Sequence, residues 1–160
     1  MMHRAFIGLG SNMVEPAAQV LRAMEAIATL PQTRVLARSS LYRSAPVGYL
    51  AQPDFINAVV QVETALAPRA LLDALLALEQ AQGRTREFQN APRTLDLDVL
   101  LYDDLQHHEH GLTVPHPHMH ERAFVLLPLL EIAPDCVIPG VGQAQRAMAQ
   151  CTDQQLQRLP

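Results

Sequence analysis

The feature that most restricts the fold is the order of the apolar segments along the chain. Short apolar runs with alternation are typical of strands, whereas apolar residues three and four apart indicate one face of a helix. These patterns predict strand, helix, strand, strand, helix, strand over Ala5–Leu9, Glu15–Leu30, Arg34–Tyr42, Phe55–Ala65, Arg69–Gln82 and Thr94–Tyr102. This order is typical of an α+β, ferredoxin-like sandwich, in which helices pack on an antiparallel sheet. The helices would cover one face, and the other face would be covered by the C-terminal part or used for function.

Proline and glycine mark the limits of the predicted helices. Pro31 ends the first helix, Pro68 opens the second, and Gly83 stops it, in keeping with the preferences of these residues for helix ends. Further along, the pattern predicts a short helix over Phe124–Ile132 and a weak one over Gln143–Leu159. We expect a turn or loop at Gly8–Asn12, at Arg84–Arg93 and in the polar, His-rich stretch that ends at His120. No repeat or linker divides the chain, so residues 1–160 are expected to form a single domain.

Charge and the absence of lysine restrict the function. The chain of 160 residues has a formal net charge of −4, and all 12 basic residues are arginine. A negative charge argues against nucleic-acid binding, and a catalytic or Walker-type lysine is excluded. Any nucleotide phosphates must therefore be bound by arginine, whose guanidinium can grip two oxygens at once. Because no apolar run has transmembrane length and no signal peptide is recognisable, we expect a cytoplasmic protein with no membrane partner.

Two acidic residues alternate with apolar ones in the last predicted strand. Successive side chains of a strand point to opposite faces, so Asp96 and Asp98 share one face, about 7 Å apart. The opposite face would enter the core with Leu95, Leu97, Val99 and Leu101. Two carboxylates held so close favour Mg²⁺, a hard ion that accepts one or two carboxylates together with water and phosphate oxygens. A strand with one solvated face would show the same spacing, and the spacing alone does not separate the two interpretations.

Arginines cluster just before this acidic strand. Arg84, Arg86 and Arg93 lie within fifteen residues of the two aspartates. Acids for a metal ion next to arginines for anions are typical of a site that handles phosphate groups. Salt bridges on the surface would be the alternative, and such pairs stabilise a protein little.

Several motifs follow one another in an order that resembles a known family. They are Gly10–Asn12, Gln52–Ala58, Glu79 with Gly83–Arg86, Pro92–Asp98, Leu112–His116, Arg122–Phe124 and Glu131–Pro134. The most specific is Pro92–Asp98, which resembles the signature of 6-hydroxymethyl-7,8-dihydropterin pyrophosphokinases, also called 2-amino-4-hydroxy-6-hydroxymethyldihydropteridine diphosphokinases. The resemblance covers nearly the whole chain. It implies a cytoplasmic, monomeric enzyme of folate biosynthesis that transfers a diphosphoryl group from ATP to 6-hydroxymethyl-7,8-dihydropterin.

The resemblance also implies a role for each matching residue. Asp96 and Asp98 would hold two Mg²⁺ ions that bridge the ATP phosphates and would be catalytic together with Arg84, Arg86 and Arg93. The residues implied to bind ATP are Glu79, Arg84, Arg86, Arg93, His116 and Arg122. The residues implied to bind the pterin are Ser44, Val47, Phe55, Asn57 and Phe124, with the two phenylalanines on either side of the ring and the amide at its edge.

Two departures keep other functions open at this stage. Many family members carry an Arg-Trp-Gly type of run where this chain has Gln89–Ala91, and some have tyrosine at Pro117. An inactive relative that binds pterin or ATP is therefore one alternative. The other is a non-catalytic, His-rich metal-binding protein, because histidines alternate or cluster at positions 107, 108, 110, 116, 118 and 120.

Overall fold

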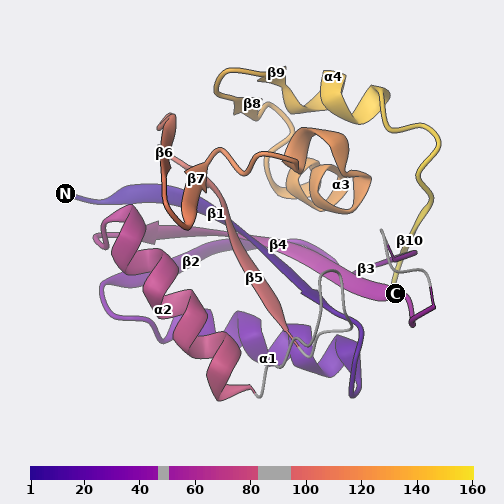
Figure 1. Ribbon diagram of the computed structural model, residues 1–160, viewed down its shortest axis with the longest axis horizontal. Coiled ribbons are helices and arrows are strands. Elements are labelled where there is room, and N and C mark those ends of the chain that lie inside the picture. Colours follow the sequence, from indigo (N-terminus) through magenta and orange to yellow (C-terminus); the bar gives the residue numbers. More distant parts are fainter. Residues whose placement is uncertain (47–50, 83–94) are drawn as a thin grey trace.

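The computed structural model describes residues 1–46, 51–82 and 95–160. A twisted antiparallel sheet runs through the middle of the molecule, with helices on both sides (Figure 1). In chain order the main elements are β1 His3–Ser11, α1 Pro16–Ala28, β2 Thr33–Arg38, β3 Tyr42–Ser44, β4 Phe55–Thr64, α2 Pro68–Ala81, β5 Asp96–Tyr102, α3 Ala123–Ile132, α4 Ala144–Ala149 and β10 Leu156–Arg158. The shorter ones are β6 His107–Glu109, β7 Leu112–Val114, a 3₁₀ turn at Met119–Glu121, β8 Val137–Ile138 and β9 Gly142–Gln143. The predicted α+β class, with helices packed on an antiparallel sheet, is confirmed.

The sheet has the strand order β10-β3-β4-β1-β5, and β2 pairs with β4 as a sixth strand. The prediction of one strand over Arg34–Tyr42 was wrong, because β2 and β3 pair with different parts of β4. At the break between them, the backbone N–H of Val59 donates to the Ser39 hydroxyl at 2.9 Å. The Ser39 side chain thus takes the place of a backbone carbonyl as the acceptor, and the chain can bend between β2 and β3.

The first core lies between the sheet and the helices α1 and α2 (Figure 1). Both helices begin with a proline, as expected from its missing N–H and fixed φ. Their buried apolar residues are Val20, Ala23, Met24, Ile27, Leu71 and Leu75. These recur at helical spacing, so each helix presents one apolar stripe to the sheet.

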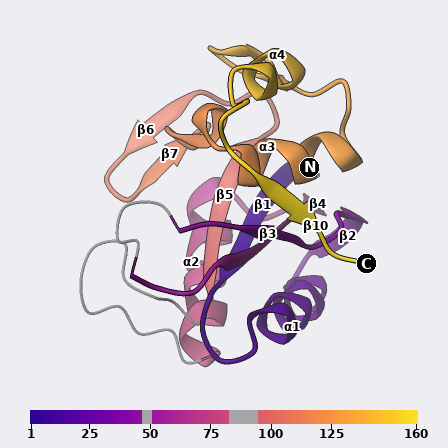
Figure 2. The same cartoon turned by 90° about the vertical axis from the view of Figure 1, so that its right-hand side faces the viewer.

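The second core lies on the opposite face, under α3 and α4 (Figures 1 and 2). The short helix predicted over Phe124–Ile132 is confirmed as α3, but the helix predicted over Gln143–Leu159 was wrong. Only Ala144–Ala149 is helical, and the chain then extends and pairs as β10 with β3. The edge of β3 offers backbone groups to Leu156–Arg158, which a helix there would leave unpaired.

Three smaller sequence predictions were also wrong. The predicted turn at Gly8–Asn12 is strand up to Ser11, because Gly8 and Gly10 pair on both sides within the sheet. Leu101 packs in the second core instead of the first, because a register shift at Phe6/Ile7 of β1 inserts a residue into β5 and turns its side chain over. The His-rich stretch contains the hairpin β6–β7 instead of loop alone.

Within the described ranges, no helix is long and apolar enough to cross a membrane.

Candidate active site

The sheet register places distant residues in rows across β4, β1 and β5. Gly10 pairs with Asn57 on one side and Asp96 on the other, and Gly8 pairs with Asp98. Residues directly opposite one another in antiparallel strands point to the same face. Asn57, Gly10 and Asp96 therefore form one row, with the amide and the carboxylate about 10 Å apart across two strand spacings.

Because Gly8 and Gly10 have no side chains, the surface of the sheet is open above them. A Cβ on Gly10 would lie 3.2 Å from Oδ1 of Asn57, and a Cβ on Gly8 would lie 3.3 Å from Cδ1 of Leu100. Such contacts are tighter than ordinary packing, so any larger side chain would displace these neighbours. A hollow opens over the glycines, between β3 and the beginning of α3.

This first hollow brings together most of the described residues that the sequence indicated. Eight of them line it, namely Ser44, Phe55, Asn57, Asp96, Asp98, His116, Arg122 and Phe124. They come from β3, β4, β5, the segment that leads into α3 and the first turn of α3. The fold thus collects, into one cavity, residues predicted for the pterin, the phosphates and the metal. Val47, Arg84, Arg86 and Arg93 lie outside the described residues.

Residues that the sequence predicted to bind the pterin contact one another or a neighbouring residue. Nδ2 of Asn57 donates to the Ser44 hydroxyl at 2.6 Å, and both residues are buried. This bond leaves Oδ1 on the side of Gly10, toward the hollow. The guanidinium of Arg122 lies 5.6 Å from the ring centroid of Phe124, within cation–π range. An amide oxygen and an aromatic ring are therefore fixed before any ligand arrives.

His116 lies where the hollow meets the acidic strand. Its backbone N–H donates to the carbonyl of Leu100 at 2.9 Å, which ties it to β5. The backbone N–H of His118 donates to Nδ1 of His116 at 3.2 Å. Nδ1 is therefore the unprotonated nitrogen, and Nε2 carries the proton of the neutral ring. Burial, followed by the positive charges of Arg122 and His118, lowers the pKa of His116 to about 4, although Asp96 opposes the shift.

This pKa predicts how stability depends on pH in the protein without nucleotide or metal. The unfolded state protonates His116 near its ordinary pKa of 6.5, whereas the folded state does so only near about 4. The unfolded state therefore binds more protons between these values, and stability is lost as pH falls below 6.5. We expect wild type to lose about 1–2 kcal/mol more than His116→Asn between pH 7 and 5 in denaturant unfolding. The exposed His110→Asn is the control, and equal losses in all three proteins would contradict the assignment.

Glu79 lies behind the acidic strand. Its side chain is buried on α2, and Oε2 accepts the backbone N–H of Leu97 at 2.6 Å. Leu97 stands between Asp96 and Asp98, so Glu79 holds the backbone that carries both. It lines neither of the hollows described here, and its predicted contact with ATP stays a prediction.

A second hollow adjoins the first. Its lining includes Leu72, Val99, Leu112 and Thr113, and it shares Asp98 and His116 with the first hollow. The two hollows therefore meet at a carboxylate and an imidazole, and the second hollow continues between apolar side chains and the polar residues His108, Glu109 and His110. Sequence reasoning missed Leu72 and Val99 as lining residues, and it missed Gly8 and Gly10 as the floor. The spacing of the glycines, two apart on a strand, was the available signal for the floor.

The acidic pair offers oxygen ligands from one face of β5, as a Mg²⁺ site requires. In the described part of the chain, no group of three or more His, Cys, Asp or Glu residues could hold a metal ion, and this applies to the surroundings of the acidic pair as well as to the histidines. His107 and Glu109 pair with each other at 2.8 Å, and Arg69 also binds Glu109 at 2.8 Å. These contacts explain the polar hairpin without a metal.

Comparisons with known proteins define the class first and then the family. The chain has the α+β fold of the crystal structure of Plasmodium falciparum HPPK-DHPS with pteroate, with a TM-score of 0.76 and 13% identity; the match covers 96% of this chain and 43% of that one. The sequence from residue 6 to 134 matches the family described as 7,8-dihydro-6-hydroxymethylpterin-pyrophosphokinase (HPPK). The chain belongs to this family of pyrophosphokinases.

Close relatives match along their whole length. The chain is 46% identical over 160 residues to the 2-amino-4-hydroxy-6-hydroxymethyldihydropteridine pyrophosphokinase of Pseudomonas aeruginosa, covering 100% of this chain and 99% of the relative. It is 43% identical over 158 residues to the enzyme of the same name from Haemophilus influenzae, covering 99% of each. The predicted family is thereby confirmed.

Proposed function

We propose that the two adjoining hollows form one cleft that transfers the diphosphoryl group of ATP to the hydroxymethyl group of 6-hydroxymethyl-7,8-dihydropterin. The chain is an ATP-dependent diphosphotransferase of folate biosynthesis, as its family membership indicates. The observation that carries the residue assignment is the meeting of both hollows at Asp98 and His116. A ligand in each hollow would bring its reactive end to the same place.

The first hollow suits the pterin. It has one buried amide on its floor and two aromatic rings, Phe55 and Phe124, in its lining. A flat heterocycle gains contact area from such rings, and Oδ1 of Asn57 can accept a hydrogen bond from an N–H group at the ring edge. The glycine floor leaves room for a ring to lie close to β1. Val47, which lies outside the described residues, is proposed to add a loop contact.

The second hollow suits the nucleotide base. Leu72 and Val99 provide apolar surface, and Leu112 and Thr113 provide a strand edge beside it. From there the phosphates would extend toward Asp98, His116 and Arg122. The proton on Nε2 of His116 can be donated to a phosphate oxygen, and the guanidinium of Arg122 can bind two such oxygens. Glu79, Arg84, Arg86 and Arg93 complete the proposed nucleotide site.

The reaction then needs alignment and charge neutralisation more than a covalent intermediate. The hydroxyl oxygen of the pterin forms a bond with the β-phosphorus and gives up its proton, which is released to solvent. The bond between this phosphorus and the oxygen that bridges it to the α-phosphorus breaks, and AMP leaves with that oxygen. Asp96 and Asp98 are proposed to hold two Mg²⁺ ions, which when bound would neutralise charge on the phosphates. The residues of the cleft hold both substrates in line and exclude water from the transferring group.

The products test this reaction directly. Purified protein mixed with ATP, Mg²⁺ and 6-hydroxymethyl-7,8-dihydropterin should release AMP and form a pterin diphosphate in equal amounts, measured by chromatography. Without the pterin, we expect little AMP, because the β-phosphorus then lacks its nucleophile. Formation of ADP and a pterin monophosphate would mean attack on the γ-phosphorus and would contradict the proposal.

We further propose that residues 1–160 act as one domain and as a monomer in the cytoplasm. The first hollow is built mainly from β1, β3, β4, β5 and α3, and the second from α2, β5, β6 and β7, all of one chain. It therefore needs no residue from a second copy. Gel filtration combined with light scattering would test this, and a stable dimer would contradict it.

A further inference from the structure

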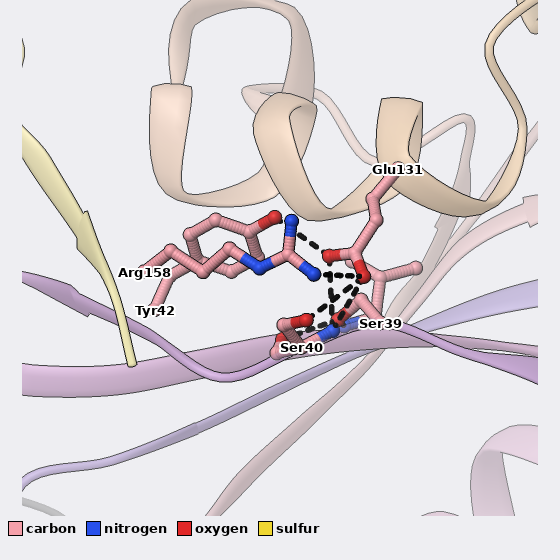
Figure 3. Close-up of polar contacts among 6 residues, drawn as sticks. Ser39, Ser40, Tyr42, Glu131 and Arg158 are labelled. Carbon is pink, nitrogen blue, oxygen red and sulfur yellow. Dashed lines mark hydrogen bonds and ion pairs between the residues drawn. The ribbon is translucent and has the colours of Figure 1, made fainter. Parts of the chain in front are cut away.

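Glu131 joins two elements that end in the first hollow. It lies at the C-terminal end of α3, and its carboxylate reaches the segment that leads into β3 (Figure 3). Oε1 accepts the backbone N–H of Ser40 at 2.9 Å and the Tyr42 hydroxyl at 2.6 Å. Oε2 accepts the Ser40 hydroxyl at 2.9 Å. One carboxylate thus binds three donors on the strand side.

The charge of Glu131 makes these hydrogen bonds strong. Its side chain is 24% exposed and lies 3.5 Å from the guanidinium of Arg158 on β10. Burial alone would raise the pKa of Glu131, but hydrogen bonds from Tyr42 and Ser40 and the charge of Arg158 outweigh it and lower the pKa. Burial, and then the bond to Glu131, raise the pKa of Tyr42 to about 12. At neutral pH the carboxylate is therefore ionised, and the phenol keeps the proton that it donates.

Both elements held by Glu131 carry residues of the first hollow. Tyr42 and Ser44 are two residues apart on β3, so they point to the same face, and Ser44 binds Asn57. Phe124 and Glu131 are seven residues apart on α3, which is two helical turns, so they also share a side, about 10 Å apart along the axis. The contact at Glu131 therefore sets where the aromatic wall, at Phe124, stands relative to the amide wall, at Ser44 and Asn57.

We propose that Glu131 is a positioning residue for the pterin, acting through β3 and α3 without touching the substrate. This inference rests on the proposed function, because it assumes that the first hollow binds the pterin. Loss of the carboxylate would let the two walls move apart and would weaken pterin binding. The nucleotide end, which is built mainly on α2, β5 and β7, would be unaffected.

The test compares Glu131→Gln with the matched control Glu63→Gln. Glu63 also has a side chain that is 24% exposed and pairs with an arginine, Arg34 at 3.0 Å, but it lies on the far part of β4. We expect Glu131→Gln to raise KM for the pterin 5- to 20-fold, with KM for ATP and kcat within about twofold of wild type. Glu63→Gln should leave all three values unchanged. Melting temperatures of all variants are measured alongside.

Each outcome is decisive. A lower melting temperature for Glu131→Gln with an unchanged KM for the pterin would show a merely structural tie and overturn the inference. Equal increases in KM for both substrates would overturn it too. If Glu131→Gln does not fold, Tyr42→Phe, which removes a single hydroxyl, should raise KM for the pterin two- to fivefold, and no change would overturn the inference. If wild type itself releases no AMP in the assay, the proposed function has failed instead, which is a distinguishable result.

Discussion

Replacing Asp96 or Asp98 by alanine should lower turnover by roughly two to three orders of magnitude each, because in the proposed mechanism each change removes an oxygen ligand from the ions that neutralise the transferring phosphates. Both carboxylates line the first hollow from one face of β5. Initial rates of AMP release at saturating substrates measure the effect. Asp73→Ala, on the exposed side of α2, is the control and should retain wild-type turnover.

A binding measurement separates loss of the site from loss of the fold. Mg²⁺ with a non-hydrolysable ATP analogue, at about a hundred times its Kd, should stabilise wild type by about 2–3 kcal/mol, which is roughly 5–10 °C in Tm. Asp96→Ala and Asp98→Ala should gain much less, whereas Asp73→Ala should gain as much as wild type. A solvated strand face predicts the opposite, namely normal turnover and equal stabilisation in all four proteins.

Asn57→Ala should weaken pterin binding by about 1–3 kcal/mol, which is roughly a 5- to 150-fold rise in Kd, because a buried polar group of the ligand then loses its partner. The amide oxygen faces the floor of the hollow, and its nitrogen already donates to Ser44. Calorimetry with the pterin measures the effect. Affinity for the ATP analogue should change less than twofold.

Ser44→Ala distinguishes two roles for Asn57, namely direct contact with the pterin and an indirect role in holding β3 in place. This variant removes the acceptor of Asn57 at 2.6 Å but leaves the amide in place. If Asn57 contacts the pterin, Ser44→Ala should have a clearly smaller effect than Asn57→Ala. Equal effects would show that Asn57 acts only by holding β3, and an unchanged affinity in both would remove the pterin from this hollow.

Local sequence patterns were sufficient to predict the helices and strands that bury one face. The helical spacing, together with Pro31 after the first helix and Pro68 at the start of the second, placed α1 and α2 within a few residues of their observed limits. Alternation correctly placed Asp96 and Asp98 on one face of β5. Both results follow from backbone geometry alone, because side-chain direction repeats every two residues in a strand and every 3.6 in a helix.

Elements whose form depends on distant partners were predicted poorly. The stretch Leu156–Arg158 is a strand only because β3 offers it an open edge, and Leu101 changes core because of a bulge against β1. Tyr42 was predicted only as the last residue of a strand, and the hydrogen bond from its hydroxyl to Glu131 depends on where α3 packs. Intrinsic preferences are weak compared with such tertiary contacts.

By itself, the sequence determined the α+β class, the family and the chemical character of the cleft, since acids, arginines and aromatic residues occur in recognisable motifs. Only the tertiary structure decided how those motifs meet. The register of β4, β1 and β5 brings Asn57, Gly10 and Asp96 into one row. The carboxylate of Glu131, near the end of α3, joins this helix to Ser40 and to Tyr42 of β3. Registers and contacts between elements are long-range properties, because each depends on which strand edges and helix faces remain available after the rest of the chain has folded.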